Sequence, residues 1–150
     1  MLRRSLLALM LALAVTACGG SDDNPTTPTP QPPQGPATLQ IVDVTVGTGA
    51  EATGTKLLVL HYTLYAYDPA GPDGRGTRLQ GSRDFGRTLD FRQATNAVIP
   101  GFEQGVQGMR AGGVRRLTVP PSLAYGSAGN SLVAPNAWIV FEIELISVTD

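Results

Sequence analysis

The stretch AVIPGFEQGVQGMRAGG, residues 97–113, decides the fold, because it holds the one plausible helix of the chain. Its apolar residues recur at roughly helical spacing: Ile99, Phe102, Val106 and Met109. Gly101, Gly105 and Gly108 interrupt this pattern, and each glycine costs a helix interior about 1 kcal/mol relative to alanine. The sequence therefore predicts a helix over residues 101–109 that carries an unusual amount of glycine.

Strand patterns surround this helix. In residues 138–148, apolar and polar side chains alternate as they do in a half-buried antiparallel strand. The expected strands cover residues 39–47, 56–67, 88–92, 114–120 and 138–148. Residues 68–78 and 121–136 are dense in turn-forming residues and are expected to be loops. Five or six strands and one helix predict an α+β fold, with the helix covering one face of an antiparallel sheet.

The N-terminus resembles the export signal of a bacterial lipoprotein. Arg3 and Arg4 precede an apolar run, residues 6–15, that is too short to span a bilayer. The following VTAC, residues 15–18, resembles a lipobox, which implies a signal peptide of residues 1–17 and lipid attachment to Cys18. The alternative is an ordinary secretory signal that leaves Cys18 as a free thiol.

This resemblance implies a location as well. Two or three acyl chains on Cys18 would hold the protein firmly in a membrane of the bacterial cell envelope. Gly19 stands where many lipoproteins retained at the inner membrane carry aspartate. We therefore expect an outer-membrane anchor that faces the periplasm.

Residues 18–37 follow as a linker. They are rich in proline and threonine and almost free of apolar side chains, so they cannot offset the entropy lost on ordering. Proline makes them a semi-rigid spacer, roughly 60 Å long where extended at about 3.1 Å per residue. The alternative is that they form a proline-rich ligand for another module. Residues 38–150 then form the folded domain.

Several classes of function are disfavoured by composition. The formal net charge is −1 and the basic residues are scattered, so no nucleic-acid partner is expected. The pair Arg115 and Arg116 is interpreted as a solvated strand edge. His61 is the only histidine and Cys18 the only cysteine, which argues against a metal site, and we expect His61 to be structural. Without a charged nucleophile, function must rest on an apolar cavity with a few polar groups.

Five segments, in order, resemble the FKBP-type peptidyl-prolyl cis-trans isomerases. They are LHYT (60–63), GTRLQGSRD (76–84), VIPGFEQGVQGMRAGG (98–113), VPPSLAYG (119–126) and PNAWIVFEIELISV (135–148). The resemblance implies a curved antiparallel sheet of five or six strands wrapped on one short helix. It implies isomerisation of X–Pro bonds in exported proteins, without a cofactor, and a macrolide ligand of the rapamycin type. We expect a monomer.

The same resemblance implies a set of pocket residues. The catalytic positions are Tyr62, Phe91, Ile99, Tyr125 and Phe141. The substrate-binding positions are Leu79, Gln80, Leu89, Val98 and Phe102. The backbone N–H of Ile99 and the hydroxyl of Tyr125 would bind substrate carbonyls. The glycines of the helix would let other backbone, or the bound proline, approach closely.

The chain departs from the family pattern at several positions. Leu89 stands where phenylalanine is common, Leu64 stands where glycine often follows the Tyr-Thr pair, the loop over residues 68–78 is longer than in minimal members, and the loop around Asn130 and Ser131 lacks the family's common pattern. Phe102 replaces the usual tryptophan of the pocket floor, and Leu79 replaces a phenylalanine. Gln80 replaces an aspartate; its amide oxygen could still accept a hydrogen bond, but it brings no charge. These departures leave three interpretations open: an isomerase with reduced turnover, a chaperone or adaptor that binds proline segments without useful turnover, and a structural envelope lipoprotein that has lost the pocket's function.

Overall fold

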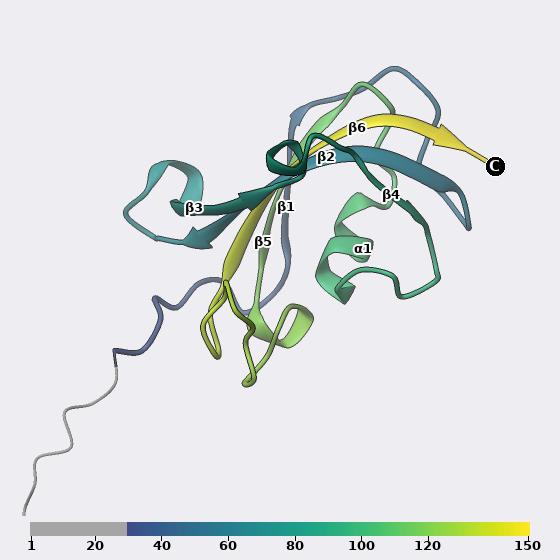
Figure 1. The fold of residues 1–150 in the computed structure, drawn as a ribbon. Helices are drawn as coiled ribbons and strands as arrows, with labels where there is room; N and C mark the ends of the chain where they lie inside the picture. The colour runs from purple at the N-terminus through teal and green to yellow at the C-terminus, as the bar shows by residue number, and fades with distance from the viewer. Residues whose placement is uncertain (1–29) are drawn as a thin grey trace, which may run out of the picture.

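The computed structural model describes residues 30–150 (Figure 1). The predicted signal peptide and Cys18 lie outside the described residues, as does most of the predicted linker. Within residues 30–150, no helix is both long and apolar enough to cross a bilayer.

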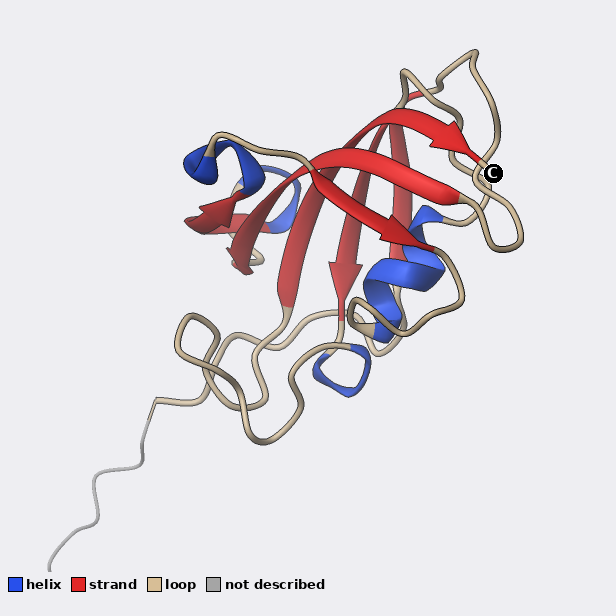
Figure 2. Cartoon of the chain, turned by 45° about the vertical axis from the view of Figure 1, so that its right-hand side comes forward, coloured by secondary structure: helices blue, strands red, loops and turns tan. Residues whose placement is uncertain are grey.

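One antiparallel sheet forms the body of the described chain. Its strands are β1 (Gln40–Thr45), β2 (Leu57–Tyr67), β3 (Arg75–Gly81), β4 (Leu89–Arg92), β5 (Val114–Val119) and β6 (Ile139–Thr149). They lie in the order β1-β5-β6-β2-β3, and β4 pairs with β2. Figures 1 and 2 show the sheet curving over a single helix, α1 (Pro100–Val106). The predicted α+β class is confirmed. Three short 3₁₀ turns complete the elements: η1 (Pro72–Gly74), η2 (Ser82–Phe85) and η3 (Pro121–Leu123).

The core lies between the sheet and α1. Along β2, Leu58, Leu60 and Leu64 are buried on one face of the strand, and Tyr62 is half-buried on the same face. Along β6 a period of two buries Ile139, Phe141, Ile143 and Leu145. These side chains and those of β5 meet the buried face of α1, which includes Phe102 and Val106.

The glycines of α1 are required by its close approach to β5. A Cβ atom added at Gly105 would lie 2.2 Å from Cδ1 of Leu117, and one added at Gly101 would lie 2.3 Å from Cγ1 of Val119. Real Cβ atoms do not come so close to another heavy atom. Glycine therefore lets the helix backbone pack directly on the side chains of the sheet, and this gain outweighs its poor helix propensity.

The helix ends earlier than the sequence predicts. Gln107 adopts an extended ψ of 134°, and Gly108 has a φ of 71°, so the helical backbone stops at Val106 rather than at Met109. Arg115 of β5 fixes this end, because one guanidinium nitrogen donates to the carbonyl oxygens of Gly105 (2.9 Å) and Gln107 (2.8 Å). A cation that bonds the last carbonyls of a helix stabilises its C-terminus.

The interpretation of Arg115 and Arg116 as a solvated strand edge is therefore wrong. Arg115 is only 8% exposed and forms two hydrogen bonds with Asp43 besides those to the helix. Arg116 is mostly buried and lies 3.1 Å from a carboxylate oxygen of Asp73. The sequence pattern could not show this, because the partners come from distant parts of the chain.

The loop predicted over residues 68–78 is also shorter than expected. Strand β3 begins at Arg75, which pairs with Tyr67, and Arg78 pairs with Tyr65. The turn residues Gly71 and Gly74 made the whole stretch look irregular, but they close a tight turn before the strand.

We expect Gly105→Ala to lower the free energy of unfolding by up to about 2 kcal/mol. Overpacking against Leu117 costs about 1–3 kcal/mol, from which the ~1 kcal/mol that alanine gains in a helix is subtracted. Urea unfolding measures the difference, with the exposed neighbour Gln104→Ala as the matched control. A Gly105→Ala variant more stable than the wild type would show that the close contact does not exist.

Candidate functional site

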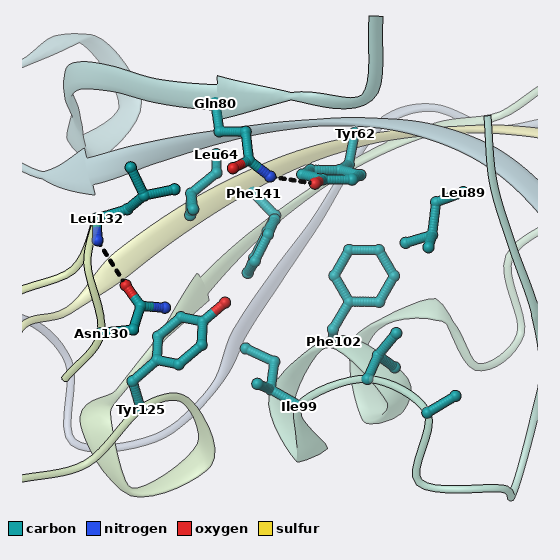
Figure 3. A pocket seen from close by; sticks show the side chains of 12 residues that line it. Tyr62, Leu64, Gln80, Leu89, Ile99, Phe102, Tyr125, Asn130, Leu132 and Phe141 are labelled. Carbon is teal, nitrogen blue, oxygen red and sulfur yellow. Dashed lines mark hydrogen bonds between the residues drawn. The ribbon is translucent and has the colours of Figure 1, made fainter. Parts of the chain in front are cut away.

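A cavity of about 540 Å³ lies on the helix side of the sheet. Figure 3 shows its side chains converging from β2, β6, α1 and the loops that precede α1 and β6. The lining residues are Tyr62, Leu64, Gln80, Leu89, Ala97, Val98, Ile99, Phe102, Tyr125, Asn130, Leu132 and Phe141. None of these side chains carries a charge. Most are apolar, and the polar ones are two phenols and two amides.

Aromatic rings form the base of the cavity. The ring of Phe102 meets Phe141 edge-on, with centroids 5.0 Å apart, and meets Tyr62 edge-on at 6.3 Å. Tyr62 and Phe141 also contact each other at 6.0 Å. Edge-to-face pairs of this kind add about 0.5–1.5 kcal/mol each to the area they bury. The interlocked rings make a rigid apolar surface.

Tyr62 occupies a break in the sheet. On one edge of β2, residues 57–60 pair with β4, whereas residues 63–67 pair with β3. Tyr62 falls between the two partners, so its backbone N–H donates instead to the hydroxyl of Ser82 at 3.2 Å. The same hydroxyl lies 2.8 Å from Nδ1 of His61. Ser82 thus replaces the missing strand, and His61 has the structural role that the sequence indicates.

Gln80 holds the hydroxyl of Tyr62. Its side-chain nitrogen donates to that oxygen at 2.6 Å, as Figure 3 shows. The contact with Tyr62 therefore uses the amide nitrogen of Gln80 as a donor, whereas the sequence drew attention to the amide oxygen as an acceptor. Because the hydroxyl oxygen of Tyr62 is the acceptor, its own proton remains available to another group.

The corner that presents Gln80 is held by an acidic side chain. Asp84 accepts from the backbone N–H of Gly81 at 2.8 Å and pairs with Arg78 at 2.7 Å. The hydrogen bonds from Arg78 and Gly81 lower the pKa of the Asp84 carboxyl. Asp84 therefore stays ionised near neutral pH and keeps the end of β3 in place.

The loop between β5 and β6 closes the other side of the cavity. Asn130 organises it, because its side-chain oxygen accepts from the backbone N–H groups of Leu132 and Val133, both at 2.8 Å. Leu132 is then left 45% exposed at the rim. The hydroxyl of Tyr125 points into the cavity (Figure 3). Burial, together with the nearby Tyr62, raises the pKa of the Tyr125 phenol, so it stays protonated at neutral pH.

The start of α1 supplies the remaining wall. Ile99 is the residue before the helix, with an extended ψ of 149°, as expected for a residue that precedes proline. Its carbonyl accepts from the N–H groups of Phe102 and Glu103. Its own N–H makes no hydrogen bond within residues 30–150, so it is free to donate to a ligand.

The structure brings eight of the ten residues implied by the resemblance into this cavity and leaves Phe91 and Leu79 outside its lining. Phe91 is 5% exposed and supports Phe102 from the core, with centroids 6.0 Å apart. Leu79 lines a neighbouring cavity. Adjacent residues of a strand point to opposite faces, so Leu79 and Gln80 do not both face the pocket.

Four lining residues were not predicted as site residues: Leu64, Ala97, Asn130 and Leu132. Strand alternation from Tyr62 would have found Leu64, since residues two apart on a strand share a face. The absence of the family's usual loop pattern at Asn130 was a further signal. Nothing in the sequence pattern indicates Ala97 or Leu132.

The chemistry of the cavity follows from its lining. It offers no carboxylate pair, no nucleophile beside a base and no charged group. The described part of the chain also holds no cluster of three or more residues of the metal-ligating types His, Cys, Asp and Glu. An apolar surface with a few neutral hydrogen-bonding groups defines a site that binds a neutral, largely apolar segment.

Comparison with known proteins places the chain in a family. Residues 49–146 match the model of the FKBP-type peptidyl-prolyl cis-trans isomerases. An FK506-binding protein of Streptomyces anulatus is 36% identical over 115 residues, which cover 75% of this chain and 88% of that protein. An FK506-binding protein of Neisseria meningitidis is 34% identical over 111 residues, which cover 73% of this chain and 95% of that protein.

Solved structures agree with this assignment. The crystal structure of AtFKBP13 has a TM-score of 0.62 at 32% identity and covers 73% of this chain and 91% of that one. The crystal structure of FkpA from Escherichia coli has a TM-score of 0.61 at 32% identity. The match covers 74% of this chain and 48% of the FkpA chain. The chain belongs to the FKBP-type peptidyl-prolyl cis-trans isomerase family. The FKBP-like fold and the isomerase activity expected from the sequence are confirmed.

We expect Ser82→Ala to destabilise the protein by about 1–3 kcal/mol, because it leaves the N–H of Tyr62 and the ring nitrogen of His61 without their partner. The exposed Ser122→Ala is the matched control and should change stability by less than about 0.5 kcal/mol. Thermal unfolding of both variants measures the difference. Equal effects of the two substitutions would contradict the role given to Ser82.

Proposed function

We propose that the cavity floored by Phe102 catalyses isomerisation of X–Pro bonds in proline-containing polypeptides by binding the twisted amide better than either planar form. The observation that carries this proposal is the neutrality of the lining: apolar side chains surround a few neutral hydrogen-bonding groups, among them the hydroxyls of Tyr62 and Tyr125 and the N–H of Ile99.

No covalent step is needed for such a reaction. Rotation about the amide bond is slow because it breaks resonance, with a barrier of about 18–20 kcal/mol. A site lowers this barrier only by interactions that are stronger in the twisted state than in the planar one. The planar amide is the more dipolar form, so an uncharged, apolar wall disfavours it relative to the twisted form.

We assign the roles as follows. Ile99 and Phe102 hold the proline ring, and Phe91 supports Phe102 from the core. The N–H of Ile99 and the hydroxyl of Tyr125 donate to substrate carbonyls on either side of the rotating bond. The remaining wall, near the carbonyl that rotates, is formed by Tyr62, Leu89 and Phe141.

Gln80 changes the hydrogen bonding of the Tyr62 hydroxyl but leaves the Tyr62 ring in the pocket wall. An aspartate at this place would be an acceptor and would draw the proton of the Tyr62 hydroxyl. The amide nitrogen of Gln80 uses a lone pair of that oxygen instead, at 2.6 Å. Tyr62 therefore keeps a proton that it can donate to the substrate.

The same contact supports a second candidate function, a module that binds proline segments with weak turnover. The donated hydrogen bond fixes the ring of Tyr62 in one position, and a wall fitted to a planar substrate would bind without catalysing. Macrolides of the FK506 and rapamycin kind would occupy the same pocket in either case, as the names of the FK506-binding relatives suggest.

We also propose that the chain acts in the bacterial cell envelope, as a monomer anchored through lipidated Cys18. The support is the sequence alone: a basic start, a short apolar run and the VTAC motif before Cys18. In this setting, the isomerase would speed the folding of exported proteins, for which proline isomerisation can be rate-limiting.

Tyr125→Phe should reduce kcat/KM roughly two- to tenfold, the loss expected for one neutral hydrogen bond. NMR exchange spectroscopy on the peptide Ala-Leu-Pro-Phe measures the rate, using the full chain with Cys18→Ser so that it stays unacylated. Since burial raises the pKa of the phenol, the wild-type rate should hold up to about pH 10. Stability should fall as the pH rises from the ordinary pKa of a phenol toward this raised pKa, because the unfolded chain loses its Tyr125 proton first.

The control is Tyr65→Phe, which removes a hydroxyl outside the cavity lining. A rate lowered equally by both substitutions would contradict the role of Tyr125.

In the same assay, Gln80→Asp separates the two candidate functions. A large gain in turnover at unchanged peptide affinity supports the binding module, and no gain supports the isomerase.

Cys18→Ser should move the protein from the membrane fraction to the soluble fraction and abolish incorporation of labelled fatty acid. A single acyl chain binds a membrane only marginally, so firm retention of the wild type also implies more than one chain. Fractionation of bacteria that express both forms measures this. Membrane retention of Cys18→Ser would contradict lipid anchoring through this residue.

A further inference from the structure

A second cavity, which we call the side groove, lies beside the pocket and has a volume of about 370 Å³. On the domain side it is lined by Tyr67, Leu79, Leu132, Val133 and Trp138, with small alanines between them. Its other wall is made by residues 30–33 of the proline-rich segment that precedes the domain. No charged side chain takes part in its lining.

The end of this segment is seated on two aromatic rings. The indole N–H of Trp138 donates to the carbonyl oxygen of Pro36 at 2.9 Å. A Cβ atom added at Gly35 would lie 2.7 Å from Cδ1 of Trp138 and 3.0 Å from Cε1 of Tyr67. The backbone at Gly35 therefore lies directly against both rings, in a place where only glycine fits.

The segment is partly buried. Pro32 and Gly35 are half-buried, as is Pro36. The exposed positions are Gln31, Pro33 and Gln34. Residues 31–36 form neither helix nor strand. The segment is therefore irregular chain that buries part of its length against the domain, and proline-rich chains of this kind prefer the extended polyproline II conformation.

The contacts are those by which proteins recognise proline-rich chains. Such sites place aromatic rings under the extended chain, whose backbone is already ordered and costs little entropy to bind. Here Tyr67 and Trp138 supply the rings, and the indole N–H supplies the hydrogen bond to a backbone carbonyl. Residues 30–36, PQPPQGP, carry no charge, which matches the uncharged groove.

We propose that the side groove is a second binding site for extended, uncharged, proline-rich polypeptide. Residues 30–36 of the same chain occupy it in this structure, and a segment of a client protein exchanges with them. The space of about 370 Å³ left between the segment and the domain shows that the chain's own segment fills the groove incompletely. A client segment with larger side chains would fill it better.

The side groove lies next to the pocket. Leu132 lines both the groove and the pocket, so a chain held in the groove lies beside the pocket's rim. The groove would thereby keep a proline-rich client near the site of isomerisation. This consequence rests on the proposed function, whereas binding in the groove does not depend on turnover.

The test uses Trp138, the only tryptophan in the chain, as a fluorescent reporter. A tethered segment competes at an effective concentration in the millimolar range, so it must be weakened before a free peptide can bind well. The full chain with Cys18→Ser is compared with the same chain carrying Gly35→Ala, which forces the segment off the rings. Gln34→Ala is the matched control, because Gln34 is exposed.

Gly35→Ala should shift the Trp138 emission to longer wavelength, and Gln34→Ala should leave it unchanged. The free peptide Pro-Gln-Pro-Pro-Gln-Gly-Pro should then restore the emission saturably, with an apparent affinity for Gly35→Ala at least about tenfold above that for Gln34→Ala. Equal emission of the two variants, or a titration that does not saturate, overturns the proposal.

An excess of Ala-Leu-Pro-Phe, which occupies the pocket, separates the two sites. Persistence of the Trp138 response in this excess supports the groove, and its loss shows that the peptide binds in the pocket and overturns the proposal. Exchange rates in the same samples test the proposed function separately. A saturable Trp138 response without isomerisation leaves the groove supported and contradicts only the proposed function.

Discussion

The contact between α1 and β5 is the constraint on which the rest of the structure depends. Gly101 and Gly105 bring the helix backbone onto Val119 and Leu117, at distances that no other residue type permits. Phe102 follows Gly101 in α1, and its side chain forms the pocket floor. The same contact therefore sets the depth of that floor. Arg115 fixes the helix end from β5. Core packing and pocket shape are therefore determined by one set of contacts, and a change in one alters the other.

The side chains that line the pocket carry no charge. Its polar groups are phenols, amides and one backbone N–H. At the break between β3 and β4, neutral partners hold Tyr62, whose N–H donates to Ser82 and whose hydroxyl accepts from Gln80. Charge enters only outside the cavity, where Arg78 and Asp84 hold the corner that presents Gln80. A substrate amide that meets no charge in the site loses the solvation that favours its planar, dipolar form. This environment suits a reaction in which no bond is made or broken.

Local patterns predicted most of the fold and much of the site. Period-two alternation predicted β6, an apolar run predicted β2, and the glycine-rich stretch marked the one helix of the described chain. The sequence could not place Phe91 or Leu79, because the depth of a side chain depends on neighbouring strands. It could not show that Arg115 bonds the end of α1, or that Trp138 binds Pro36, since these partners are distant in sequence. Prediction failed for residues whose environment depends on contacts between elements that are distant in the sequence.

The most direct test of the site of isomerisation is to map where a proline peptide binds. Backbone ¹⁵N–¹H correlation spectra of the full chain with Cys18→Ser would be followed during titration with Ala-Leu-Pro-Phe. We predict that the largest shifts occur at Ile99, Phe102 and Tyr125, with exchange between cis and trans peptide visible at the same site. Largest shifts at Leu79 and Trp138, with Ile99 unchanged, would contradict the claim that the cavity above α1 is the site of isomerisation.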